Sequence, residues 1–420
     1  MSQSKHQTFL KKSLAIAVAT FAVSTAQAAT EKDEIQQLRQ EVEALKALIQ
    51  QQHQVQQQQQ VQLAEVKAQP VAAAPTNLKT KAGAEVNLYG FVRGDANYII
   101  EGADNDFNSV GNVGRGGDKD PKSVEDKLRA TAKTTRLGLD FKSKVEGADV
   151  GGKVEVDFAG TDESLRIRHA YLTLNNWLFG QTTSNFLSNH APEMIDFGTN
   201  IGGGTSRLPQ VRWSHKLAPT TQLFISAEEG NSTGDGIKYR LPTLTAKVTQ
   251  AYAEGKGNAS ARALIENYKS DTAGDDKTGF GVAIGTNYQI SEPLKVSADV
   301  SYVKGNSNYL YGSNSAYVVD ANNNIEQNEF IATQLGATYK FSPQLRSTLA
   351  YGAHYADDST GYAKTNPSAN ETVQQAWINF IYTPVKPVDL GVEYINGKRE
   401  TFAGQSYNDD RVGLMAKYSF

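Results

Sequence analysis

Arginines recur in this 420-residue chain at positions where their guanidinium groups could bind small anions. Each stands in or beside a short stretch in which apolar and polar residues alternate, on the polar side of that alternation. A planar guanidinium donates two parallel hydrogen bonds to one carboxylate, which suits it to reversible binding of organic anions. The candidate binding residues are Arg93, Arg136, Arg166, Arg168, Arg207 and Arg212.

The elements that carry these arginines have the period-two pattern of β-strands. At the C-terminal end, Val412, Leu414 and Tyr418 share one face with the terminal Phe420. A strand that is apolar on one side, polar on the other and ends on an aromatic residue is typical of the last strand of an outer-membrane β-barrel. The same alternation runs from Asn87 onward. We therefore predict an all-β, antiparallel transmembrane β-barrel over residues 87–420, with the arginines facing its lumen.

Short turns allow the strands to be counted. Seven segments have the length and composition of short turns, namely 145–150, 175–176, 218–220, 242–243, 291–293, 342–344 and 385–387. With both ends of the barrel on the same side as these turns, the count is sixteen strands. Residues 258–269 also alternate, but a seventeenth strand would break the even number that bacterial single-chain barrels keep. We therefore assign residues 253–278 to one long outer loop. A sixteen-stranded barrel is wide enough for an aqueous channel.

On the fourth predicted strand, Arg166 and Arg168 share a face with Leu172 and Leu174. The arginines belong on the lumen side and the leucines on the lipid side, and one strand can achieve both only if its register shifts between them. The pattern therefore suggests a β-bulge there.

A long segment, residues 184–206, contains apolar residues that a water-exposed loop would not need. They are Phe186, Leu187, Met194, Ile195, Phe197 and Ile201. A loop folded into the lumen would bury them, and it would bring Glu193 and Asp196 close to the arginines. Facing walls of opposite charge create a transverse field that orients a charged solute. Glu193 and Asp196 are therefore the predicted acidic partners at a constriction.

The first 86 residues have a different organisation. Residues 1–28 have the basic start, the apolar core and the Ala26-Gln27-Ala28 site of a signal peptide, and the apolar run is too short to span a membrane. Residues 29–69 repeat apolar residues at heptad spacing around a glutamine-rich middle, which predicts a coiled coil in the periplasm. A disordered glutamine-rich tether is the alternative. Residues 70–86 form a linker.

Composition sets limits on these interpretations. The chain has no cysteine, which fits a barrel that crosses the periplasm unfolded. Its net charge is −3, so a positive pore must be a local arrangement rather than a property of the whole chain. No Gly-x-Ser-x-Gly motif is present and the histidines are scattered. We therefore expect no enzyme, cofactor, metal site or nucleic-acid partner.

Several stretches resemble porins. Residues 87–95, 135–142 and 168–174 are similar to the first, second and fourth strands of general porins, in which arginines form a basic ladder opposite an acidic loop. Arg136 and Arg168 match that ladder, and Arg207 or Arg212 matches less closely. The loop departs from the usual Pro-Glu-Phe-x-Gly motif, because residues 192–198 are Pro-Glu-Met-Ile-Asp-Phe-Gly. That departure leaves the acidic partner open.

The exported glutamine-rich coiled coil ahead of such a barrel, together with residues 179–186, resembles the DcaP family. The resemblance implies a homotrimeric channel for dicarboxylic acids and similar small organic anions in the outer membrane of a Gram-negative bacterium. Its expected surroundings are the lipid bilayer and lipopolysaccharide, with peptidoglycan as a further partner of the coiled coil. A sugar porin with a coiled-coil extension, or a tether between the outer membrane and the cell wall, are the alternatives.

Overall fold

The structure is a computed structural model that describes residues 78–81, 83–115, 123–198 and 200–420. The predicted signal peptide, the predicted coiled coil and residues 70–77 of the predicted linker lie outside these ranges. No helix within the described ranges is both long enough and apolar enough to span a membrane.

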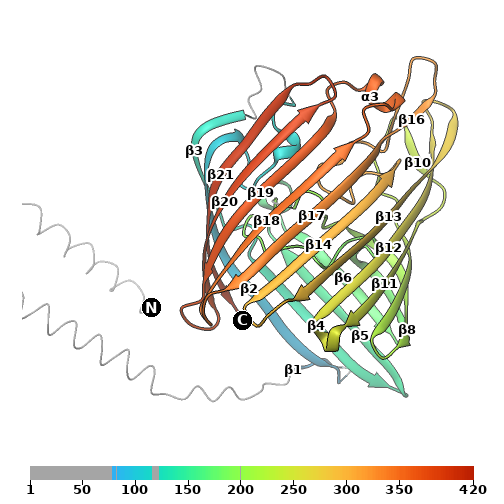
Figure 1. Cartoon of the computed structure of the whole chain (residues 1–420). Coiled ribbons are helices and arrows are strands. Elements are labelled where there is room, and N and C mark those ends of the chain that lie inside the picture. Colours follow the sequence, from blue (N-terminus) through green and yellow to red (C-terminus); the bar gives the residue numbers. More distant parts are fainter. Residues whose placement is uncertain (1–77, 82, 116–122, 199) are drawn as a thin grey trace, which may run out of the picture. The chain divides into compact units, whose positions relative to one another are not determined.

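One antiparallel sheet closes on itself because β21 (Ser406–Ser419) pairs with β2 (Glu85–Ala103). At the seam, Gly90 and Phe420 exchange two backbone hydrogen bonds of 3.0 and 3.1 Å. Figure 1 shows the strands as a tilted, continuous wall. Because the first and last strands pair with each other, neither is left as a free edge strand, which matters in lipid because no water is available there to satisfy backbone N–H and C=O groups.

Two barrel strands are interrupted. β3 (Ser123–Thr131) and β4 (Arg136–Val145) pair with successive parts of β2, and β10 (Ile237–Tyr239) and β11 (Thr243–Tyr252) pair with successive parts of β12 (Gly257–Ser270). With each interrupted strand counted once, the described residues form sixteen barrel strands. The others are β5 (Ala148–Asp157), β6 (Arg166–Leu174), β7 (Trp177–Thr183), β8 (Arg207–Ala218), β9 (Thr221–Glu228), β13 (Asp275–Gln289), β14 (Leu294–Lys304), β17 (Glu329–Lys340), β18 (Leu345–Ala356), β19 (Asn370–Tyr382) and β20 (Val388–Thr401). 

Short elements lie beside the barrel strands. β1 (Leu78–Lys79) pairs with the start of β2, so the sheet begins a few residues before the predicted Asn87. The remaining elements are the strands β15 (Tyr317–Val319) and β16 (Ile325–Gln327), the helix α3 (Gly361–Thr365), and the 3-10 turns η1 (Val110–Asn112), η2 (Thr161–Glu163) and η3 (Ala253–Gly255).

The predicted number of strands is correct, but two predicted positions are wrong and their errors cancel. Residues 253–278 are not one outer loop, because β12 and the start of β13 lie within them. The segment 242–243 is not a turn between strands, because it lies at the break between β10 and β11. The true short turn follows β11, at residues 253–256. Pro242 has no N–H to donate to a ladder, which makes the break look like a turn in the sequence. Residues 258–269 alternate as a strand does, but with 242–243 counted as a turn they would have made a seventeenth strand, and the even-number rule then excluded the wrong segment.

Elsewhere the alternation places apolar side chains outside, as predicted. Ile284 of β13 is 62% exposed and Leu335 of β17 is 52% exposed, whereas Arg262 of β12 and Asp299 of β14 are buried in the lumen. Lipid covers the outer set in a membrane.

Three segments from the long-loop end narrow the lumen: the described part of residues 104–122 with η1, the described part of residues 184–206, and residues 305–328 with β15 and β16. In the second segment, Phe186, Leu187, Ile195 and Ile201 are 0–3% exposed. Phe186 and Leu187 pack with residues of β12, β14 and β17. The prediction that residues 184–206 fold into the lumen is therefore confirmed, although Phe197 remains 36% exposed.

Two glycines let residues 184–206 lie flat against other backbone. Gly202 has a φ of +81°, and a Cβ there would lie 2.1 Å from the carbonyl oxygen of Thr333. A Cβ at Gly204 would overlap the carbonyl oxygen of Tyr309. A larger residue at either position would force the segment away from the wall.

The inside–outside assignment makes a direct prediction. Replacing Ile284 by Arg puts a charge at the middle of the lipid-facing belt and should destabilise the folded barrel by about 2–4 kcal/mol. Ser297→Arg is the control, because Ser297 pairs with Asn287, whose side chain contacts His190 in the lumen. Urea unfolding in lipid vesicles measures both, and equal losses would contradict the assignment.

Candidate functional site

A β-bulge in β6 places two arginines in the lumen. In the pairing of β5 with β6, Glu155 lies opposite His169, and the next residue of β5, Val156, lies opposite Ile167. Arg168 of β6 therefore has no partner on β5 and is the extra residue of the bulge. Ile167 points to lipid and is 52% exposed, whereas Arg168 is buried. The bulge suggested by the sequence is thus confirmed, and it explains how Arg166 and Arg168 face inward on the strand that turns Leu172 outward.

The counter-ions of these arginines lie on the same wall. Arg166 donates to both oxygens of Asp157 at 2.9 and 2.7 Å. Arg168 donates to Glu155 at 2.7 Å and to Asp157 at 3.0 Å. Arg136 lies 3.4 Å from Glu155 and stacks over the ring of Phe91. Because Glu155 and Asp157 belong to β5, beside the arginines, they hold the guanidinium groups in place from behind.

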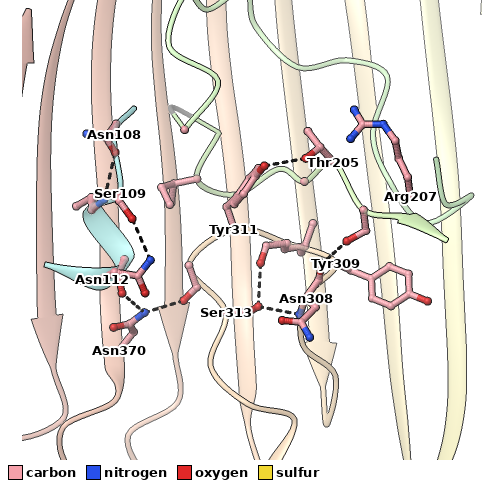
Figure 2. Close-up of a pocket in the computed structure, with 18 of the residues that line it drawn as sticks. Asn108, Ser109, Asn112, Thr205, Arg207, Asn308, Tyr309, Tyr311, Ser313 and Asn370 are labelled. Carbon is pink, nitrogen blue, oxygen red and sulfur yellow. Dashed lines mark hydrogen bonds between the residues drawn. The ribbon is translucent and has the colours of Figure 1, made fainter. Parts of the chain in front are cut away.

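Arg207 differs from its neighbours. It lies close enough to Arg136, Arg166 and Arg168 for their positive charges to interact. Within the described residues its side chain makes no hydrogen bond or ion pair, and its buried Nε has no partner. Figure 2 shows the guanidinium projecting beside the cavity, away from the hydrogen bonds drawn there. A guanidinium with unused donors in a positive environment is a ready partner for an anion.

Arg166, Arg168 and Arg207 border a cavity of about 660 Å³, which we call the inner cavity. Its charged lining residues are Arg115, Arg166, Arg168 and Arg207, and no carboxylate is found among the described residues that line it. Neutral side chains form the opposite side, including Asn108, Ser109, Asn112, Asn308, Tyr311 and Ser313 (Figure 2). The cavity is therefore positive on one wall, and apart from Arg115 the other wall is neutral.

Glu193 does not face this arginine wall, contrary to the prediction. Its carboxylate pairs with Arg346 of β18 at 2.8 Å. Its carbonyl oxygen accepts hydrogen bonds from Trp377 and Asn379. The contacts hold residues 184–206 against β18 and β19, and they use the acid that was expected to oppose Arg168.

Asp196 is also engaged elsewhere. It is 1% exposed and accepts hydrogen bonds from the backbone N–H groups of Asn108 and Gly198. Arg93 of β2 is itself buried: it pairs with Asp95, donates to the carbonyl of Ile195 and stacks over Phe197 at 4.4 Å. Arg93 therefore anchors the lumen segment and does not line the inner cavity.

Arg212 is separate from the cluster. Its Nε donates to Gln210 at 3.0 Å and another guanidinium N–H donates to the carbonyl of Thr183. The charged group that interacts with it is Glu228, not Arg207. Of the six predicted arginines, the structure brings Arg136, Arg166, Arg168 and Arg207 together.

Sequence reasoning missed the neutral wall. Tyr311 comes from residues 305–328, where its N–H donates to Gly203 and its hydroxyl lies 2.7 Å from Thr205 (Figure 2). Ser109 and Asn112 come from residues 104–122. Both segments carry apolar residues within polar surroundings, the same signal that identified residues 184–206: Phe107, Val110 and Val113 in one, Tyr309, Leu310 and Tyr311 in the other.

Basic side chains tie residues 104–122 to the barrel. Arg411 of β21 donates to the carbonyl groups of Ala103 and Asn105. At the start of the segment, hydrogen bonds from Lys127 and Arg129 hold the pKa of Asp104 below its usual value, against the opposing effect of partial burial. The segment that carries Ser109 and Asn112 is thus fixed at its base.

A closed sixteen-stranded antiparallel barrel whose lumen is narrowed by inward-folded loops is the architecture of an outer-membrane channel. The chain belongs to the DcaP family, since the model of the DcaP outer membrane protein family matches residues 14–420.

Solved structures agree with this assignment. The crystal structure of the outer membrane channel DcaP of Acinetobacter baumannii is 70% identical, with a TM-score of 0.79 over 82% of this chain and 99% of that chain. The anion-selective porin from Comamonas acidovorans is 13% identical, with a TM-score of 0.54 over 80% of this chain and 100% of that chain. OmpT of Vibrio cholerae is 13% identical, with a TM-score of 0.53 over 82% and 99%. The last two likenesses concern the fold alone. A comparison with curated proteins finds no match.

One carboxylate of β20 holds the tip of residues 184–206, which gives a prediction. Glu393 accepts the N–H groups of Ile195 at 2.9 Å and Asp196 at 2.8 Å. In Glu393→Gln an amide NH₂ meets one of these N–H groups, and losing a charge-assisted bond should speed hydrogen exchange at both amides by about tenfold or more. Glu292→Gln, in the exposed turn 290–293, is the control. Unchanged exchange in Glu393→Gln would show that the tip is held by other contacts.

Proposed function

We propose that this outer-membrane channel passes small organic anions, dicarboxylic acids in particular, by diffusion through the inner cavity. The observation that carries the proposal is the lining: four arginines, no carboxylate among its described residues, and one arginine, Arg207, whose side chain makes no hydrogen bond or ion pair with the described residues.

The mechanism is a partial exchange of hydration for guanidinium hydrogen bonds. A carboxylate that reaches the cavity loses some of its water, and Arg207 can donate two hydrogen bonds in return. Arg166 and Arg168 attract an anion less strongly than unpaired arginines would, because they form ion pairs with Glu155 and Asp157. Moderate binding suits a channel, since a solute must also leave.

The proposed site therefore consists of Arg207, Arg166 and Arg168 on one wall, with Arg136 beside them, and of Arg115 and neutral groups on the other wall. Arg93, Arg212, Glu193 and Asp196 take supporting positions around it. The prediction was a field between an acidic wall and a basic wall. In the proposed site the potential is positive instead, so an anion is attracted whichever way it is oriented.

A sugar channel is the weaker alternative. Sugar passage needs aromatic rings exposed along the lumen, and the lumen-facing Trp377 is 1% exposed, with its indole N–H donated to the carbonyl of Glu193. The tether alternative depends on residues 29–69, outside the described ranges. We retain the homotrimer, the periplasmic coiled coil, and contacts with lipopolysaccharide and peptidoglycan as parts of the same proposal.

The proposal is tested with the full-length protein in a planar bilayer. In a KCl gradient the reversal potential should show anion preference, and succinate should reduce the current. Arg207→Gln should weaken succinate binding by about tenfold, the equivalent of one lost charge-assisted hydrogen bond.

Lys238→Gln is the matched control, because Lys238 lies in β10 and forms its ion pair with Asp271, outside the inner cavity. It should leave succinate binding unchanged. Cation preference in the wild-type channel, or equal succinate binding in the wild type and Arg207→Gln, would reject the proposal.

A further inference from the structure

A second cavity, of about 610 Å³, lies nearer the long-loop end of the barrel, and we call it the outer cavity. It is enclosed by the segments that follow β2, β9, β14, α3 and β20. Asn112, Arg115, Asn308 and Ser313 line both cavities. The two cavities are therefore adjacent.

The outer cavity is also free of carboxylates among its described lining residues, and it contains Arg115 and Arg399. Arg399 is 1% exposed and fully engaged, since it donates to Asn370, to the carbonyl of Val113 and to the carbonyl of Ser368. Arg399 thus contributes a fixed positive charge. The exposed Arg115 is held through its Nε by the carbonyl of Gly111 and borders both cavities.

The two cavities differ in what they offer to the rest of a solute. The lining residues of the inner cavity include the aliphatic Val110, Ile201 and Leu310, which are 0–5% exposed. The outer cavity has no aliphatic side chain larger than that of Ala369 among its described lining residues. Amide and hydroxyl groups take their place: Asn112, Asn308, Asn314, Asn366, Gln405, Thr233, Ser313, Ser315, Ser368, Thr401 and Tyr362.

This lining discriminates between hydrocarbon and hydroxylated solutes. A methylene group would displace water from the amides and return no hydrogen bond, which is unfavourable. A hydroxyl group both donates and accepts, and so does an amide, so a hydroxyl can replace the displaced water. Asn366 and Gln405 are suitable partners, because each uses only part of its side chain, in bonds to Tyr362 and Tyr407 respectively.

We infer that the outer cavity is a separate binding site for hydroxylated organic anions, from which the anion moves past Arg115 into the inner cavity. Its carboxylate is attracted by Arg115 and Arg399, and its hydroxyls bond to the amide and hydroxyl lining. This inference rests on the proposed function as an anion channel and adds a selectivity for the body of the solute.

Tartrate and succinate provide the test, because both are four-carbon dianions and differ in two hydroxyl groups. Each is added at the long-loop side of the full-length channel in a planar bilayer, and its binding constant is obtained from current fluctuations. In the wild type, tartrate should bind about fivefold more tightly, the effect of one modest hydrogen bond.

Two variants locate the preference. Asn366→Leu and Gln405→Leu remove amides at nearly constant size, and each should abolish the preference for tartrate while succinate binding stays the same. Asn322→Leu, in the loop between β15 and β16 and outside both cavities, should keep the preference. If one of the two leucine variants fails to fold, the other still tests the inference. A KCl conductance equal to that of the wild type shows that a variant has folded.

The outcomes separate the two proposals. If neither acid reduces the current, the proposed function fails and the inference fails with it. If both acids bind equally in the wild type, or if tartrate keeps its advantage in both leucine variants, the outer cavity is not a site for hydroxylated anions and the anion channel stands. Arg207→Gln should weaken both acids alike, because both must cross the inner cavity.

Discussion

The pairing of β21 with β2 is the constraint on which the rest of the structure depends. It removes the unpaired sheet edge, and it fixes the seam residues that hold the lumen segments. From this seam Arg93 of β2 donates to Ile195, and Arg411 of β21 donates to Ala103 and Asn105. Glu393 lies one strand away and binds the same tip of residues 184–206. Charged groups that look like pore residues thus serve to place the loops, and the loops in turn shape both cavities.

The electrostatic character of the lumen follows from where the counter-ions lie. Glu155 and Asp157 stand behind Arg166 and Arg168 on the neighbouring strand, while the acids of residues 184–206 are used by Arg346 and by backbone N–H groups. The cavity is therefore positive although the chain has a net charge of −3. Because the positive side faces neutral amides and hydroxyls, selection by charge and selection by hydrogen bonding occur on different surfaces of one path.

Much of the architecture could be predicted from the sequence, because period-two alternation and turns are local properties. The β6 bulge and the inward fold of residues 184–206 followed from the same logic. The break at Pro242 was counted as a turn, and the even-number rule then excluded the alternating residues 258–269, so one strand was misplaced although the total remained sixteen. The partners of Glu193, Asp196 and Arg93 could not be predicted, since they depend on contacts between strands far apart in the chain. Tyr311 and Ser109 were missed only because the apolar-residue criterion was applied to one loop and not to the other two.

The central claim is that the inner cavity holds an organic anion at Arg207. The most direct test is a crystal structure of the channel grown with bromosuccinate, in which bromine is located by its anomalous scattering. The account predicts a bromine peak within the inner cavity, with a carboxylate in contact with the guanidinium of Arg207 and the acid lying between that wall and Tyr311. An inner cavity without bromine, alongside ordered bromosuccinate elsewhere in the lumen, would contradict it.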